Sequence, residues 1–174
     1  MRQLLAGLFV VIMVAVLFGS QNTATQQIRV IVDSVALLEV SRTTFAFEIT
    51  EGAFVEGERA VFDNIEGGTI WYTSVSTNGK SRSITASLSD PTILDFMETA
   101  IEVRSPESGV GELGHSSGRV ILSDVPKVIL SNIGTCWTGR AQGATFIYDV
   151  EVRSPEKLAS MAMIVDVIFT FSGE

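Results

Sequence analysis

Short runs of alternating apolar and polar residues dominate the chain after its first twenty positions. In residues 44–49, for example, Phe45 and Phe47 alternate with smaller or polar neighbours. A period of two places one set of side chains on each face of an extended strand, and Gly, Ser, Asn, Asp and Pro separate the runs. Strands are expected at residues 28–40, interrupted at Asp33 and Ser34, and at residues 44–49, 69–76, 81–88, 100–104, 119–123, 127–133, 144–152 and 163–171.

About eight or nine short strands without a sustained helical period predict an all-β fold. No stretch keeps a 3.6-residue period over three turns, which argues against a parallel α/β sheet. We therefore expect an antiparallel β-sandwich of the immunoglobulin-like or Greek-key type. Residues 91–98 and 155–161 are too short for independent helices and should form helical turns. Asn78 and Gly79 predict a two-residue hairpin between residues 69–76 and 81–88.

One hexapeptide, EVRSPE, occurs twice, at residues 102–107 and 151–156. Proline lacks a backbone donor and presets a turn, so each copy is expected to mark the exit from a strand. The two exits would then lie at the same end of the sandwich, or the hexapeptide is a duplicated binding loop. No other matches support the spacing, so a repeat architecture is not indicated.

The first twenty residues have the features of a cleaved secretory signal. Arg2 is followed by an uncharged apolar run over residues 4–18, shorter than the roughly 20 residues that span a bilayer. Small and polar residues follow, so cleavage is expected after Gly19 or Ser20. The alternative is a retained anchor. The predicted organisation is a signal peptide at residues 1–20 and a single β-sandwich domain at residues 21–174, secreted or displayed at the cell surface, with no membrane span after cleavage.

Composition argues against a nucleic-acid partner. The chain has 12 basic and 20 acidic residues, a formal charge of −8, and loss of Arg2 with the signal makes it about −9. Binding a phosphate backbone requires clustered Lys and Arg to displace counterions, whereas the basic residues here are scattered singly. The acidity favours solubility.

The residues that commonly perform catalysis are scarce. His115 is the one histidine and lies in a glycine-rich stretch without a nucleophile elbow, and Cys136 is the one cysteine, so neither a triad, a zinc site nor an intrachain disulfide is predicted. Trp137 beside it favours a buried thiol. We expect no enzyme, no cofactor and no metal site. A loop calcium remains an alternative, with these oxygen-bearing candidates but no EF-hand spacing: Asp33, Asp63, Asn64, Asp90 and Asp95.

Three aromatic residues raise the alternative of carbohydrate binding. Flat rings match the apolar faces of pyranoses and keep a polar group at one end. Trp71 and Tyr72 are consecutive on a predicted strand and must point to opposite faces. We expect Trp71 in the core and Tyr72 at the surface, which makes Tyr72 the candidate ligand contact, with Trp137 as a further platform residue.

A candidate for self-assembly lies at the start of the mature chain. A polar tail at residues 21–27 precedes Ile28, Val30 and Val32, which alternate along one face of an extended segment. Such a segment is either an ordinary first strand of its own domain or a donor strand that pairs with the sheet edge of another copy. Ile28, Val30 and Val32 are the candidate donor residues.

Several segments resemble a family of exported, uncharacterised β-sandwich proteins widespread in Bacteroidota. The resemblance covers most of the mature chain and rests on short blocks, listed in chain order: IRVIVDSVALLEV, WYTSVSTNGKSRSITASL, SGVGELGHSSGRVILS, VILSNIGTCWTGRAQGATFIYDVEV and VDVIFTF. It implies a secreted sandwich domain and carries over no catalytic residue. The acidic stretch TILDFMETAIE departs from the pattern and leaves the surface role open.

These features favour a non-enzymatic exported structural or surface protein. It would act as a filament or matrix subunit that self-assembles through its N-terminal strand, with other copies of itself as partners. The alternative is an adhesive or carbohydrate-binding module with surface glycans as partners.

Overall fold

The computed structural model describes residues 26–41, 58–155 and 164–173. The chain divides into two units, Met1–Ile31 and Val32–Glu174. All the strands among the described residues belong to the second unit. Residues 26–31, the described part of the first unit, have no regular secondary structure.

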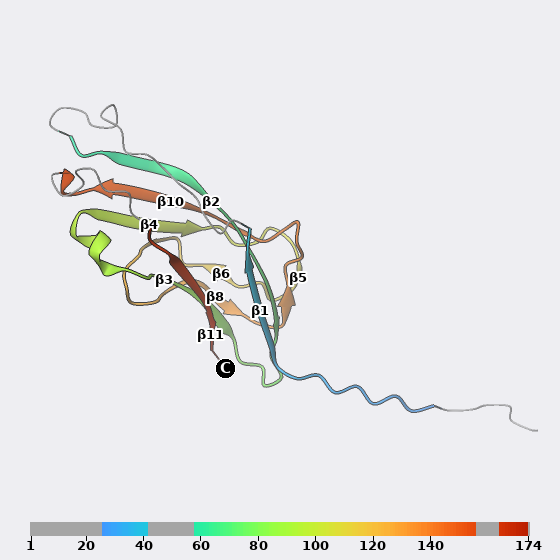
Figure 1. Ribbon diagram of the computed structural model, residues 1–174. Coiled ribbons are helices and arrows are strands. Elements are labelled where there is room, and N and C mark those ends of the chain that lie inside the picture. Colours follow the sequence, from blue (N-terminus) through green and yellow to red (C-terminus); the bar gives the residue numbers. More distant parts are fainter. Residues whose placement is uncertain (1–25, 42–57, 156–163, 174) are drawn as a thin grey trace, which may run out of the picture. The chain divides into compact units, whose positions relative to one another are not determined.

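Two antiparallel sheets form the larger unit, which is an all-β sandwich as the alternation predicts (Figure 1). The first sheet contains β1 (Val35–Val40), β2 (Val61–Val75), β4 (Met97–Val103), β5 (Val110–Gly111), β7 (Arg119–Ile121), β9 (Cys136–Trp137) and β10 (Ala144–Val152). The second sheet contains β3 (Arg82–Leu88), β6 (His115–Ser116), β8 (Lys127–Ile133) and β11 (Val167–Ser172). The number of strands exceeds the prediction because β5, β6 and β9 have two residues each.

The long strand β2 organises the first sheet. It pairs with β1, β9 and β10, while β10 pairs with β4 and β4 pairs with β7. In the second sheet the order is β11, β3, β8, β6. Among the described residues, β1 and β11 therefore each have one paired neighbour, and these are the longest strands that lie at an edge.

The core lies between the two sheets because alternate side chains of each strand point inward. Ile70 of β2, Ile101 of β4 and Ile84 of β3 are fully buried. Aromatic rings join the sheets: the Tyr72 and Phe171 centroids are 6.0 Å apart, edge to face, and those of Phe146 and Phe169 are 5.4 Å apart. Strand β11 thus faces β2 and β10.

The predicted bounds of two strands are confirmed, and those of β2 are wrong. β8 and β10 cover residues 127–133 and 144–152 as expected. β2 begins at Val61 rather than near residue 69, and Gly67 and Gly68, expected to precede the strand, lie inside it. A Cβ on Gly67 would lie 2.3 Å from the Phe146 ring. The glycine is thus a place where the opposite ring approaches the backbone, not a strand end.

The predicted hairpin at Asn78–Gly79 is also wrong. β2 belongs to the first sheet and β3 to the second, so residues 76–81 connect the two sheets. The local turn is real: Gly79 has φ +70°, and the Asn78 side chain accepts a hydrogen bond from the Lys80 backbone N–H at 3.1 Å. Asn and Gly favour a turn both in a hairpin and in a connection between two sheets. They therefore do not identify the strand with which the next strand pairs.

Of the other predicted elements, some are confirmed, some are wrong and some lie outside the described residues. Residues 28–32 form no strand, so the first part of the expected strand at residues 28–40 is wrong; its second part, residues 35–40, is confirmed as β1. The first helical turn is the 3₁₀ helix η2 (Pro91–Asp95). Residues 44–49, and all but residue 155 of the second turn, lie outside the described residues. Both EVRSPE copies do end strands, β4 and β10, but these strands are antiparallel neighbours, so the exits are at opposite ends of the sheet.

Candidate functional site

The N-terminal segment, residues 26–32, exposes its apolar side chains. Ile28, Val30 and Val32 are 78%, 77% and 57% exposed. Residues 26–34 make no strand pairing within the described part of the chain, so the interpretation as an ordinary first strand is not supported there. An extended segment with alternating large apolar residues normally buries one face against a neighbouring strand.

The point where the chain joins the sandwich is held firmly. The Ser34 hydroxyl donates to the Val75 carbonyl at 3.2 Å, and the Arg82 guanidinium donates to the Val35 carbonyl and to the Ser34 hydroxyl. Arg82 is itself buried and lies over the Phe171 ring, 5.9 Å from its centroid. These hydrogen bonds hold residues 34 and 35, at the start of β1, to β2 and β3.

Tyr72, the predicted ligand contact, belongs to the core. It is 2% exposed, and its hydroxyl donates to the Leu113 carbonyl. Burial raises the pKa of this phenol well above its usual range, and the nearby Cys136 contributes in the same direction. The prediction had the two faces reversed, because Trp71 lies on the outer face and Tyr72 on the inner one. Tyr72 is a packing residue and cannot touch a surface glycan.

A row of four side chains, here named the Trp137 row, crosses the outer face of the first sheet: Leu37, Thr73, Trp137 and Val110. Register pairs Leu37 with Thr73, Thr73 with Trp137, and Trp137 with Val110. Directly paired residues share a face, so the four side chains form a line over β1, β2, β9 and β5. Trp137 is 58% exposed, and Leu37 and Val110 are exposed to a similar degree.

Trp71 borders the Trp137 row. It is two residues before Thr73 on the same face of β2, and its ring lies over Gly143, where an added Cβ would be 2.6 Å from the ring. Its indole nitrogen is buried and has no hydrogen-bond partner in the described structure. Glu39, the residue paired with Trp71 on β1, lies 3.5 Å from the Arg140 guanidinium. The charged Glu39–Arg140 pair thus lies beside the Trp137 row.

Ion pairs lie elsewhere on this outer face. Glu98 on β4 is directly opposite Glu151 on β10, an arrangement of like charges that is unfavourable by itself. Each carboxylate has an arginine partner, Arg153 at Glu98 and Arg59 at Glu151. The hydrogen bond from Arg59 lowers the pKa of Glu151. A general acid needs the opposite shift, so Glu151 is unsuited to that role, and the two Glu–Arg pairs form a surface ion-pair ladder.

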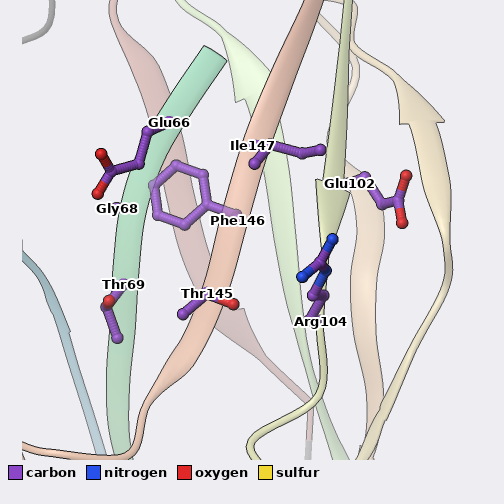
Figure 2. Close-up of a pocket in the computed structure, with 8 residues that line it drawn as sticks. All are labelled: Glu66, Gly68, Thr69, Glu102, Arg104, Thr145, Phe146 and Ile147. Carbon is purple, nitrogen blue, oxygen red and sulfur yellow. The ribbon is translucent and has the colours of Figure 1, made fainter. Parts of the chain in front are cut away.

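A depression of about 220 Å³ lies on the outer face of β2, β10 and β4 (Figure 2). Gly68 lines it, and Thr69 and Thr145 pair across its floor. Glu66 and Glu102 lie on opposite sides, and their carboxylates point away from each other (Figure 2). Catalysis by paired carboxylates requires groups that converge on one atom, and this depression does not bring them together.

The oxygen-bearing residues considered for calcium are dispersed. Asp90 caps η2, where its carboxylate accepts from the Thr92 backbone and hydroxyl at 2.9 and 2.8 Å; the backbone bond is the main cause of its lowered pKa. The Asn64 backbone N–H donates to Asp149 at 3.0 Å. Within the described ranges, no three His, Cys, Asp or Glu residues are grouped as metal ligands. His115 is exposed on β6.

Cys136 is buried, as its neighbour Trp137 indicated. Strand alternation explains the burial of Cys136 and the exposure of Trp137. Cys136 points to the core opposite Ser74, and Trp137 points outward opposite Thr73. Burial is the main cause that raises the pKa of the Cys136 thiol, partly offset by a backbone hydrogen bond at Ser74. The thiol stays protonated near neutral pH and is a poor nucleophile.

The comparisons with known proteins leave the family open. No protein-family model matches the chain, and no curated protein or solved structure matches it. The resemblance to exported Bacteroidota proteins stays a prediction. Within the residues described, no helix is both long and apolar enough to cross a membrane.

Proposed function

We propose that this chain is a non-enzymatic, exported structural subunit that assembles with copies of itself through the N-terminal segment. The observation that carries the proposal is the exposure of Ile28, Val30 and Val32 in a segment without strand pairing. Fully burying one such side chain contributes about 1.5–3 kcal/mol. A neighbouring copy can supply that burial by accepting the segment as an added strand.

Other surfaces of the described structure favour a structural role over catalysis. The carboxylates of the outer face are compensated by arginines, and the charged groups around the depression diverge. The sandwich also offers edges for pairing, since β1 and β11 each have one paired neighbour among the described residues. An exposed edge presents a row of backbone donors and acceptors to another chain.

Deleting residues 21–32 from the mature chain should abolish self-association. The chain from residue 21 is expected to give large species in size-exclusion chromatography with light scattering, and fibrous or sheet-like particles in negative-stain microscopy. The chain from residue 33 should be a monomer because it lacks the three apolar side chains. A chain from residue 26 is the matched control, since it loses no large apolar residue and should still assemble. A monomeric chain from residue 21, or assembly that survives the longer deletion, would contradict the proposal.

A second candidate function, adhesion to polysaccharide, is favoured by the Trp137 row. An exposed indole on a flat sheet face can stack on a sugar ring. The exposed Arg140–Glu39 pair supplies hydrogen-bonding groups beside it. This surface replaces Tyr72 as the place where a glycan would bind.

Replacing Trp137 by alanine should lower the affinity for a bound oligosaccharide at least tenfold. The indole provides the largest exposed apolar plane of the row, and ten-fold corresponds to about 1.4 kcal/mol. Binding would be measured on an oligosaccharide array and by titration with any oligosaccharide found. Val128→Ala is the control, because Val128 is an exposed apolar residue on the other sheet. An array on which the unaltered chain binds no sugar would refute adhesion of this kind.

A further inference from the structure

Among the residues that the structure describes, strand β11 pairs with β3 alone, so its other backbone edge is open there. Ser89 donates its backbone N–H to the Asp166 carbonyl at 2.9 Å, which marks these residues as a hydrogen-bonded pair of the antiparallel ladder. Such pairs alternate with non-bonded pairs, so Ile168 bonds to β3 and its neighbours do not. Leu88, the residue opposite Val167, instead donates to the Ser123 carbonyl at 2.8 Å, on the other side of β3. The N–H and C=O groups that point away from β3 belong to Val167, Phe169 and Phe171.

Apolar side chains beside this edge are incompletely covered. Val167, Phe169 and Phe171 point inward and pack against the core, yet all three remain partly exposed. Leu38 and Val40, on the inner face of β1, also pack against the core and remain partly exposed. β1 extends the first sheet beyond β2 and lies close to β11 (Figure 1). One more strand beside β11 would cover this apolar strip.

The N-terminal segment matches the open edge in spacing and polarity. Ile28, Val30 and Val32 are three apolar residues spaced by two, and the inward residues of β11 are likewise three apolar residues spaced by two, 167, 169 and 171. A strand with this pattern can bond to an edge while turning all three side chains toward the core. The segment is unpaired in its own chain where described, which leaves it for a second copy.

We infer that residues 28–32 of one copy add to the β11 edge of a second copy, as the outermost strand of its second sheet. Ile28, Val30 and Val32 then cover the apolar strip formed by β1 and β11. This inference rests on the proposed self-assembly and names the accepting surface. Because the donated segment and the accepting edge are different surfaces, the contact is heterologous, and repeated contacts produce a ring or an open filament.

Proline at Val167 tests the accepting edge. Proline removes a donor that faces away from β3, and the first residue of an edge strand tolerates it. Val167→Pro should weaken association at least tenfold in light scattering over a dilution series. The matched control is Ile121→Pro on β7. Leu122 donates to Thr99 at 2.8 Å, so the N–H of Ile121 also faces away from its neighbour, and this variant should assemble like the unaltered chain.

Crosslinking decides the inference independently of the proline variants. Ile31 lies on the opposite face of the segment from the three donor residues, and Ile168 is an exposed outward residue of β11. Chains carrying Ile31→Cys and Ile168→Cys, mixed and oxidised, should form a disulfide-linked heterodimer, whereas Ile31→Cys with Ile121→Cys should not. These surface substitutions leave the core intact, so they answer the question even if Val167→Pro fails to fold.

The outcomes separate the inference from the function on which it rests. If deletion of residues 21–32 abolishes assembly while Val167→Pro folds and assembles normally and the Ile168 crosslink is missing, self-assembly stands and the β11 edge is overturned. If assembly persists without residues 21–32, both are overturned. Loss of assembly in Val167→Pro together with the Ile168 crosslink supports both.

Discussion

Replacing Tyr72 by alanine is expected to lower the free energy of unfolding by about 3–5 kcal/mol, the usual cost of removing a large buried ring. The Tyr72 ring is almost wholly buried on the inner face of β2 and meets the Phe171 ring of the opposite sheet edge to face. Its hydroxyl bonds to the Leu113 carbonyl. Urea denaturation of the chain from residue 33, followed by tryptophan fluorescence, would measure the change.

Two further variants test this explanation. Tyr72→Phe keeps the ring and loses the hydrogen bond, so it should cost about 0.5–1.5 kcal/mol. Trp71, the adjacent residue, gives no clean comparison because it is half-buried. Trp137→Ala does, since Trp137 is mostly exposed, and its effect should stay within about 0.5 kcal/mol. Equal destabilisation by Tyr72→Ala and Trp137→Ala would contradict the placement of Tyr72 in the core.

Arg82→Leu is expected to lower the free energy of unfolding by about 2–4 kcal/mol. The Arg82 guanidinium comes from the second sheet and donates to Ser34 and Val35 at the start of β1, in the first sheet. Hydrogen bonds from charged donors contribute about 1.5–3 kcal/mol, and the Val35 residue that loses its donor is half-buried. The same urea titration would measure the loss.

The start of β1 should loosen in this variant. Cleavage by a protease near residues 33–36 should become faster, because the anchoring bonds of Ser34 and Val35 are gone. Arg140→Leu is the control, since the exposed Arg140–Glu39 pair at 3.5 Å is of a kind that contributes little to stability. Unchanged stability and unchanged cleavage in Arg82→Leu would show that Arg82 does not join the sheets.

Strands with clear alternation could be predicted from the sequence, bounds included. β8 and β10 are rich in apolar and β-branched residues, and Gly134 follows β8 as Ser154 and Pro155 follow β10, so the local pattern was enough. β2 was predicted too short because Gly67 and Gly68 were interpreted as breakers. Their role depends on Phe146, a residue almost eighty positions later whose ring occupies the space above Gly67. No local pattern contains that contact.

The sheet to which a strand belongs, and the face that it buries, could not be predicted from the sequence either, because both depend on contacts between distant residues. Alternation places Trp71 and Tyr72 on opposite faces, but the second sheet decides which face becomes the core. Asn78 and Gly79 indicate a turn correctly, yet only the pairing of β3 with β8 and β11 shows that the chain changes sheets there.

The candidate site was predictable in part. The spacing of Ile28, Val30 and Val32 indicated an apolar extended segment, and the structure adds that the segment is exposed and unpaired where described. The β11 edge could not be inferred beforehand, since it depends on which residues of β11 bond to β3. Trp137 was named as a platform residue. Its row with Leu37 and Val110 depends on the register of four strands.

The position of Cys136 has a consequence for the chemistry of any assembly. This sole thiol of the chain is enclosed beneath the first sheet and stays protonated. An oxidant would therefore find no accessible thiol through which to crosslink subunits. Cohesion has to come from reversible contacts, so strong denaturant alone, with no reducing agent added, should return such a material to single chains.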